Sequence, residues 1–368
     1  MHEQRDVWQM KGDWKIRPYY PFIKEEWIEG LSKILRDRSI SNFSVREDFE
    51  KKLAKYCNCK YAIAVNSGSS AIIVGMMSLG LKKENVVLGP NYGNIAWSNC
   101  CRFLNIIPYA IDVRRDNFCL DELILSKRLN ASPDLFDAVL YINHAGYTGS
   151  QLDSVVSICR EHNVFLLEDS CNALGQWFNG IHAGTRGDIG FISFGVPKLI
   201  TCGEGGAILL NNKDLYKKCK ELVYHGGWYD PPVHSRLGVG SNFVMPMHNA
   251  YFLSKQLDDI DELLGMRDNV CNYYELKGIK LKRFHQSPSI YEYETTKPKT
   301  VVDFGRKFGI QLLYHNYVTH SHHFIDRPED TPNAKYIQDH TVLLPSTLNL
   351  SKGSIDLVCA AIKMGERQ

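Results

Sequence analysis

Short apolar runs alternate with helix-like stretches between about residue 60 and residue 212. Runs that are apolar on both faces are typical of strands inside a mostly parallel sheet, because helices cover both sides of such a sheet. Seven runs fit this description: Tyr61–Val65, Val86–Leu88, Tyr109–Val113, Ala138–Ile142, Phe165–Leu167, Phe191–Phe194 and Ala207–Leu210. Helical patterns lie between them, at Ser70–Leu79 and Ser150–His162, and before them, at Glu25–Arg36 and Val45–Tyr56. The alternation predicts an α/β layered domain.

The pattern changes after about residue 250. Leucines and an isoleucine recur at helical spacing over Ala250–Arg267, which predicts one long helix, and shorter helix and strand signals follow. We therefore expect a large α/β domain with a mostly parallel sheet over residues 1–250 and a smaller C-terminal α+β domain over residues 251–368. The N-terminal segment 1–30 is expected to pack near the smaller domain.

Charge and cysteine content narrow the classes of partner. The chain has 368 residues and a formal net charge of +2, from 43 basic and 41 acidic residues, which argues against nucleic acid and against a membrane surface. Met1–Lys15 lacks the apolar core of a secretory signal, and no apolar run is long enough to span a membrane. The eleven cysteines include no C-x-x-C pair, so we expect reduced thiols in a cytoplasmic protein and no metal site.

Three polar stretches each follow a predicted strand. Asn66–Ala71 opens an apolar helix, where free N–H groups and the helix dipole favour a phosphate, although a serine-capped helix start needs the same residues. Glu168 and Asp169 end a strand where ligands of α/β sheets bind, and Asp169 there either pairs with a ring nitrogen or caps a turn. Lys198 is either a solvated surface lysine or an amine that forms a Schiff base. Together they supply what a pyridoxal-phosphate site requires.

Three further features have ordinary explanations. Cys202–Ala207 is a glycine-rich turn without a G-x-G-x-x-G pattern or a Walker lysine, so it is not a nucleotide loop. His320, His322 and His323 are interpreted as part of a polar loop rather than as metal ligands. Trp228–Pro232 is as compatible with a surface loop as with a substrate contact.

The sequence as a whole resembles the DegT/DnrJ/EryC1/StrS family of sugar aminotransferases, a branch of the fold-type I pyridoxal-phosphate enzymes. The resemblance covers nearly the whole chain and is strongest over residues 18–250. The spacing of five residues from Ser193 to Lys198, and of six from Lys198 to Glu204, fits the family. The other matching stretches are Asn66–Ala71, Gly89-Pro90 with Pro108 and Asp112, His144 with Gly146, Glu168–Gly175, Gly184–Asp188, Gly203–Gly206, His225-Gly226 and Gly240–Phe243.

The resemblance implies a cofactor, pyridoxal 5'-phosphate (PLP, or PMP in its aminated form), and residues that hold it. Lys198 is implied to attach the cofactor and to act as general acid and base, and Asp169 to hold the proton on the ring nitrogen. Asn94 stands where an aromatic residue usually stacks on the ring. Asn172 stands where glutamine or histidine usually lies near the phenolic oxygen. Val244 replaces the arginine of a common Asn-Tyr-Arg pattern.

The phosphate contacts are implied in the same way. Ser193 and the backbone around Gly68, Ser69 and Ser70 are expected to bind the phosphate. Asn242 matches an asparagine that reaches the phosphate of the neighbouring subunit. The resemblance therefore implies a homodimer whose active sites lie at the subunit interface.

The implied function is that of a cytoplasmic aminotransferase of amino-sugar and polysaccharide biosynthesis. It would take the amino group of an amino acid, glutamate or glutamine, and transfer it to a keto sugar, expected to be nucleotide-linked. Three alternatives stay open. They are a sugar dehydratase of the same family, an aminotransferase for a cyclitol or other non-nucleotide carbonyl, and a cofactor-binding regulator without turnover. In the dehydratases a histidine typically replaces the lysine. The presence of Lys198 therefore argues against a dehydratase.

Overall fold

A computed structural model describes residues 14–37, 43–227, 239–283, 286–314, 318–319 and 331–368. Its central sheet has seven strands: β1 (Tyr61–Val65), β2 (Val86–Pro90), β4 (Ile107–Ile111), β5 (Ala138–Ile142), β6 (Phe165–Asp169), β9 (Ile189–Ser193) and β10 (Gly206–Leu210). Their order is β1-β10-β9-β6-β5-β2-β4. Only the pairs that β10 makes with β1 and β9 are antiparallel. The predicted mostly parallel sheet is confirmed.

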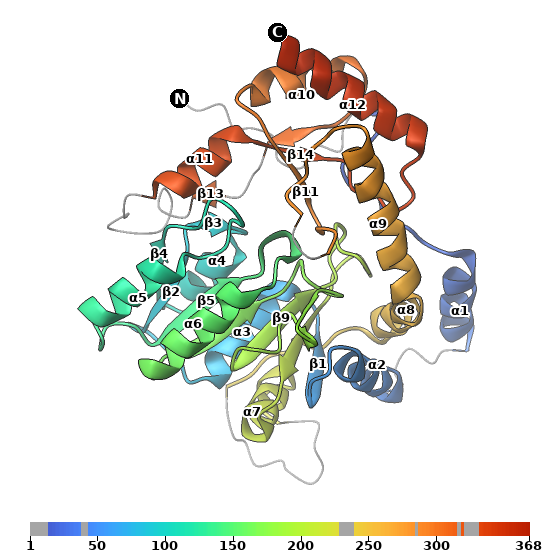
Figure 1. Cartoon of the computed structure of the whole chain (residues 1–368). Helices are drawn as coiled ribbons and strands as arrows, with labels where there is room; N and C mark the ends of the chain where they lie inside the picture. Colours follow the sequence, from blue (N-terminus) through green and yellow to red (C-terminus); the bar gives the residue numbers. More distant parts are fainter. Residues whose placement is uncertain (1–13, 38–42, 228–238, 284–285, 315–317, 320–330) are drawn as a thin grey trace.

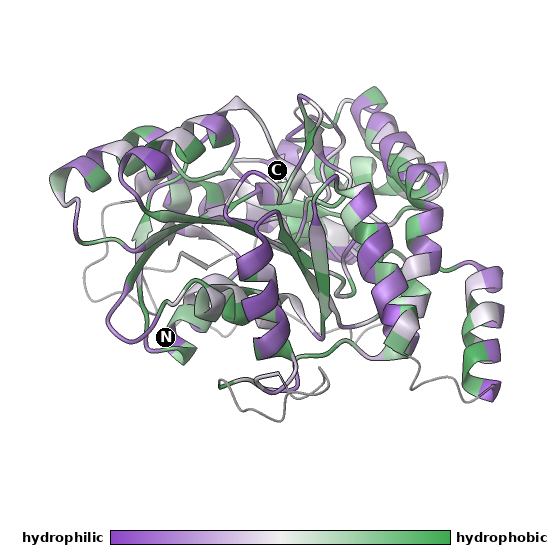
Figure 2. Ribbon diagram, turned by 90° about the horizontal axis from the view of Figure 1, so that it is seen from below, coloured by the Kyte–Doolittle hydropathy of each residue, from purple (hydrophilic) through white to green (hydrophobic). Residues whose placement is uncertain are grey.

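Helices cover both faces of this sheet (Figure 1). They are α2 (Phe43–Tyr56), α3 (Gly68–Ser78), α4 (Ala96–Phe103), α5 (Glu122–Ala131), α6 (Ser150–Glu161), α7 (Lys213–Val223) and α8 (Met247–Asp258). Helix α1 (Glu25–Arg36) packs on the outside of α8. Val87 packs toward α3, α4 and α7, whereas its neighbours Val86 and Leu88 pack toward α5 and α6. Helices α2 and α8 cover the rest of that second face. Successive strand residues point to opposite faces, so burial of both faces requires apolar residues at every position, and Figure 2 shows these hydrophobic strands enclosed by the helices.

Two predicted elements differ from the structure. The strand expected at Tyr109–Val113 runs over Ile107–Ile111, because Val113 leaves the sheet and pairs with Leu120 instead. The single helix expected over Ala250–Arg267 is wrong, since α8 ends at Asp258 and a separate helix α9 (Ile260–Leu276) follows.

A tertiary contact marks the break between α8 and α9. Asp259, at the junction, has φ −101° and ψ 15°. Its Oδ2 accepts hydrogen bonds from Trp27 Nε1 at 2.9 Å and from Lys24 Nζ at 3.1 Å. The side chain that separates the two helices is therefore held by the N-terminal helix α1 and the residue before it.

A second, antiparallel sheet lies in the C-terminal part of the chain, in the order β11 (Tyr291–Glu294), β14 (Thr341–Leu344), β12 (Leu313–Tyr314). It shares an apolar core with α9, α10 (Pro298–Lys307) and α12 (Lys352–Arg367). Ile16 joins this core and pairs with Ile310. Since Leu263 of α9 packs in the core of the central sheet, α9 connects the two cores.

Candidate active site

The start of α3 forms a polar cradle beside the end of β9. Ser67 is the N-cap residue, and its Oγ accepts from the Ser70 backbone N–H at 3.0 Å. The N–H groups of Gly68 and Ser69 belong to the first turn and have no partner within the helix. A Cβ added at Gly68 would lie 3.0 Å from Ser193 Cβ, so only glycine lets the helix start approach β9 this closely. The serine cap is confirmed, and it leaves two backbone donors without helical partners, so phosphate binding at this position stays a prediction.

Asp169 lies at the carboxyl end of β6 and is 5% exposed. The Cys171 backbone N–H donates to its Oδ1 at 3.0 Å, which fixes the carboxylate. Burial raises the pKa of Asp169, while hydrogen bonds from Cys171 and the charge of Lys198 oppose that shift. The carboxylate is thus placed where a cationic partner would stabilise it further.

Lys198 lies in the loop after β9, where its backbone N–H donates to Gly195 O at 3.1 Å. Its Nζ donates to Asn172 Oδ1. Burial lowers the pKa of Lys198, against the opposing charges of Cys171 and Asp169. A lowered pKa increases the neutral fraction of the amine, which a nucleophilic lysine requires. The solvated surface lysine considered from the sequence does not describe this residue.

Lys198 and Asp169 face one another without touching. Each shifts the pKa of the other, yet the part of the chain that the structure describes contains no ion pair between them within 4.0 Å. The amine and the carboxylate are therefore close enough to interact without an ion pair, and Lys198, Asn172 and Ser193 line one hollow. This arrangement suits a flat ring with a phosphate at one edge and a basic nitrogen at another.

Two predicted site residues lie on the exposed surface. Asn94 is exposed, and its Oδ1 accepts from the Ala96 backbone N–H at 2.9 Å, at the start of α4. Asn242 is also exposed, and its Oδ1 accepts from the Val244 N–H at 3.3 Å. Its carbonyl accepts from Asn66 Nδ2 at 3.4 Å, which places Asn242 beside the turn that leads into α3. Within one chain, the structure thus gathers Gly68, Ser69, Ser70, Asp169, Asn172, Ser193 and Lys198, but leaves Asn94 and Asn242 at the surface.

Two residues that sequence reasoning missed lie next to Lys198. Arg267 and Ser289 line both of the adjoining hollows that Lys198 lines. Arg267 is only 4% exposed. It lies four positions after Leu263 and three before Val270, so all three share the buried face of α9. A charged residue within a buried helical stripe is unusual, and that signal was available in the sequence.

The described residues contain no group of three or more histidine, cysteine, aspartate or glutamate side chains that could hold a metal ion. All eleven cysteines are free thiols, and most are buried. No helix in the described ranges is both long and apolar enough to cross a membrane. The stretch Trp228–Pro232 and the three histidines His320, His322 and His323 lie outside the described residues.

A sequence profile of the DegT/DnrJ/EryC1/StrS aminotransferase family matches residues 21–363. The chain belongs to this family. Its members use pyridoxal phosphate, and the cradle at Gly68, the buried Asp169 and the half-buried Lys198 are groups that fit this cofactor. The fold type and the cofactor expected from the sequence are both confirmed.

Three similar proteins illustrate the range within the fold. The GDP-perosamine synthase of Caulobacter vibrioides is 31% identical over 249 residues, which cover 66% of this chain and 64% of that protein. Helicobacter pylori PseC, an aminotransferase involved in pseudoaminic acid biosynthesis, superposes with a TM-score of 0.87 at 20% identity, over 96% of this chain and 99% of the other. The E. coli GDP-4-keto-6-deoxy-D-mannose-3-dehydratase superposes with a TM-score of 0.85 at 18% identity, over 95% and 98%. The fold alone therefore does not separate transamination from dehydration.

Proposed function

We propose that this chain transfers the amino group of an amino acid, glutamate or glutamine, to a nucleotide-linked keto sugar. The observation that carries the proposal is a half-buried amine, held by Asn172, that lies near a buried carboxylate fixed by Cys171. Lys198 and Asp169 influence each other's pKa without forming an ion pair among the described residues, and both lie beside the N-terminus of α3.

Each residue would have a defined task. When bound, pyridoxal phosphate supplies an electron sink that stabilises negative charge on the substrate carbon. The Gly68 and Ser69 amides and Ser193 Oγ hold the phosphate, and Asp169 keeps a proton on the ring nitrogen. Lys198 Nζ attaches the cofactor and, once released by the incoming amine, removes and returns a proton at the substrate carbon.

Asn172 is proposed to control the direction of the Lys198 amine. Its Oδ1 accepts a hydrogen bond from Lys198 Nζ, and this bond holds the amine beside Asn172. An amide oxygen can only accept, so it aligns the lysine without removing its proton. This alignment keeps the Lys198 amine near Asp169.

A lysine rather than a histidine favours transamination over dehydration. A histidine cannot attach the cofactor covalently, whereas a primary amine can. The nucleotide-linked acceptor is supported by the named product of the GDP-perosamine synthase relative. A cyclitol or another non-nucleotide carbonyl is the competing acceptor, and the experiment below separates the two.

The test divides the reaction into its halves. Holoenzyme is mixed with glutamate or glutamine, and the cofactor absorbance should shift from the aldehyde form to the aminated form. Keto sugars with and without a nucleotide, and keto cyclitols, are then added singly, and only the true acceptor should reverse the shift. Borohydride reduction followed by peptide mapping should find the cofactor on Lys198. A label on a different lysine, or an unchanged spectrum with every amino acid, would overturn the proposal.

We further propose a homodimer in which Asn242 completes the site of the other subunit. Its exposed position and its side-chain amide support this role, although the bond to Val244 is what a purely local turn would also need. Mixing Lys198→Ala with Asn242→Ala subunits tests it, because a shared site leaves one intact site in each mixed dimer. Activity should partly return once subunit exchange and the inactivity of each variant alone are established. Absence of recovery would mean that each site is built from one chain.

A further inference from the structure

Arg267 is a buried arginine whose guanidinium has no partner in the part of the chain that the structure describes. It is 4% exposed, and its Nη1 is shielded from solvent without a hydrogen bond. Among the described residues, no hydrogen bond or ion pair involves the guanidinium, and only the backbone carbonyl is used, accepting from Tyr291 Oη at 2.8 Å. Burial lowers the pKa of Arg267, which reflects how poorly its charge is compensated. An uncompensated buried charge is among the least favourable arrangements in a protein interior.

A second group with the same deficiency lies in the same hollows. Ser289 Oγ is shielded from solvent and has no hydrogen-bond partner among the residues with described positions. Its backbone is fixed, because the Ser289 N–H donates to Ala145 O at 2.8 Å. Ser289, Arg267 and Lys198 line both hollows together. Two unsatisfied polar groups that face one space beside a reactive lysine indicate a ligand that supplies the missing partners.

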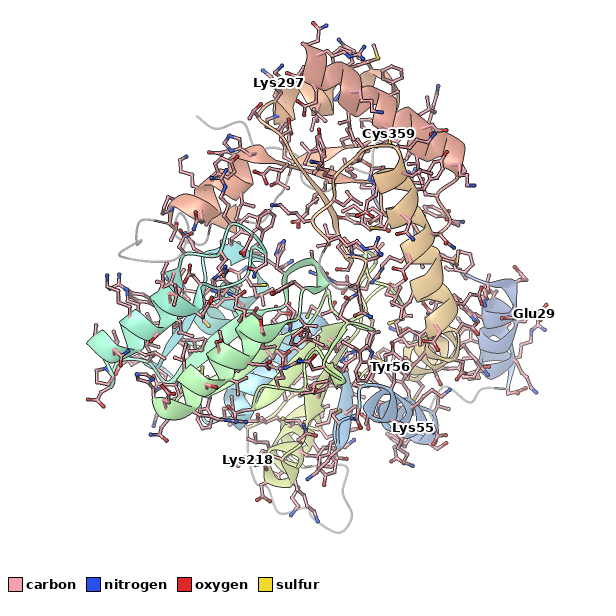
Figure 3. The ribbon with its side chains drawn as sticks, in the orientation of Figure 1. Glu29, Lys55, Tyr56, Lys218, Lys297 and Cys359 are labelled. Carbon is pink, nitrogen blue, oxygen red and sulfur yellow. The ribbon has the colours of Figure 1, made fainter. Side chains whose placement is uncertain are left out.

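The position of Arg267 is set by two cores. Helix α9 carries it between Leu263, which packs against the central sheet, and Val270, which packs against the C-terminal sheet. Burial raises the pKa of Tyr56, labelled in Figure 3 at the end of α2, to about 12, and Arg267 lies close enough for its charge to oppose that shift. The guanidinium is therefore held in place by packing and does not depend on a salt bridge for its orientation.

We propose that Arg267, assisted by Ser289, binds the carboxylate of the amino-acid donor, an inference that rests on the proposed function. A planar guanidinium matches a carboxylate with two parallel hydrogen bonds. In an amino acid, the carboxylate is attached to the carbon that bears the amine. When that amine reaches the position of Lys198, the carboxylate must lie within the same hollow, which Arg267 lines. The diphosphate of a nucleotide sugar is separated from the keto carbon by several bonds, so it would lie farther away.

The proposal predicts an effect on one half of the reaction. The keto sugar has no carboxylate on its reacting carbon, so Arg267 should matter when the donor binds and not when the acceptor binds. In Arg267→Met, which keeps the length of the side chain but removes the charge, the concentration of glutamate needed for half of the spectral shift should rise about 10- to 100-fold. The enzyme loaded with aminated cofactor should react with keto sugar at the normal rate.

Two ligands identify the group that is recognised. The unaltered enzyme should prefer glutamate to its α-amide about 10- to 100-fold, and Arg267→Met should lose that preference. Glutarate, which cannot react, should raise the melting temperature of the unaltered holoenzyme and not that of the variant. If instead nucleoside diphosphate protects only the unaltered protein, or if the variant keeps its preference for glutamate, the carboxylate assignment is wrong.

A matched control comes from a second buried arginine. Arg186 has a side chain that is 4% exposed, and its guanidinium donates to Asp153, Thr148 and Phe178 O. Arg186→Met should lower the melting temperature but leave unchanged the glutamate concentration needed for half of the spectral shift. Arg267→Met should leave the melting temperature unchanged. Should the unaltered protein fail to respond to any amino acid, the proposed function fails. Should it respond and Arg267→Met respond equally, only the Arg267 proposal fails.

Discussion

Glu168 and Asp169 are neighbours at the end of β6, yet their carboxylates lie in opposite surroundings because successive strand residues point to opposite faces. Glu168 is fully buried and accepts four hydrogen bonds, from the backbone N–H groups of Gly184 (2.6 Å), Arg186 (2.9 Å) and Gly187 (3.1 Å) and from Asn143 Nδ2 (2.9 Å). Among the described residues, the Asp169 carboxylate accepts hydrogen bonds only from Cys171, and it lies close enough to Lys198 for the two charges to interact. One carboxylate completes a loop, and the other is left for a ligand.

Two buried arginines, Arg186 and Arg267, repeat this contrast. Arg186 lies on the Glu168 side and has three side-chain hydrogen bonds, whereas Arg267 lies on the Asp169 side and has none among the described residues. Burial alone therefore does not distinguish the scaffold from the site. What distinguishes Arg186 from Arg267, and Glu168 from Asp169, is whether the charged group already has its hydrogen-bond partners, because a buried charge without partners is costly unless a ligand supplies them.

The largest effect is expected at Lys198. Lys198→Ala removes both the covalent link and the proton carrier, so turnover should fall by roughly 10⁴-fold, while removal of a buried charge should leave the fold intact. Stopped-flow absorbance with glutamate measures the loss. A residual rate within tenfold of normal would show that another group moves the proton.

Paired substitutions at β6 test the contrast directly. Asp169→Asn should reduce turnover by roughly 10²- to 10³-fold, since a neutral amide cannot hold the ring nitrogen protonated, with little change in stability. Glu168→Gln weakens several charge-assisted hydrogen bonds, so the free energy of unfolding should fall by roughly 3 kcal/mol while the folded fraction stays active. Urea unfolding and turnover per folded molecule separate the two. Equal losses of activity in both variants would contradict the division between scaffold and site.

The Glu168 side also contains a titratable group that should affect stability at low pH. Burial lowers the pKa of His182 to about 4, and its Nε2 accepts from the Gly175 N–H at 3.0 Å, with Cys57 Sγ 3.9 Å away. Unfolded histidine takes up its proton near pH ~6.5, so the stability that His182 contributes is present above that pH and is lost as the pH falls to about 4, by roughly 3 kcal/mol. In His182→Gln, the free energy of unfolding should lose this part of its decrease between pH 7 and 4. Urea unfolding at several pH values in that range measures it. An identical pH dependence would place the titrating group elsewhere.

The smallest effect is expected at the cradle. In Gly68→Ala the added methyl would lie 3.0 Å from Ser193 Cβ, which widens the gap between α3 and β9. Affinity for pyridoxal phosphate should fall about tenfold, as measured by equilibrium dialysis. Gly265→Ala on α9 is the control, because a Cβ there would meet nothing within 4 Å. If both alanine variants bind the cofactor normally, the close approach at Gly68 is not needed for the phosphate.

Local patterns were sufficient to predict the elements that the sheet requires. Runs such as Ala138–Ile142 are apolar at every position because both faces of the strand are covered, and this is visible in the sequence. The antiparallel direction of β10 could not be predicted, because its residues are as apolar as those of a parallel strand. The break at Asp259 was also missed, because no glycine or proline marks it and a contact with Trp27 accompanies it.

The candidate site was predicted through its order along the chain rather than through its geometry. Lys198 and Asp169 each follow a strand, so a shared sheet edge could be inferred. Arg267 was missed because its importance lies in the absence of a partner, which only packing reveals. Ser289 carries no pattern at all, and its relation to Lys198 comes from the path of the loop before β11.

The bridge between Ile16 and Ile310 has a consequence for how the chain is made. A ribosome releases Ile16 long before it synthesises its partner, so the core that contains both residues is completed only when nearly the whole chain has emerged. Contacts between residues so distant along the chain form slowly. Until then, an apolar segment at the leading end stays uncovered, and a nascent chain stalled before residue 310 should be a substrate for chaperones even though its central sheet has all its strands.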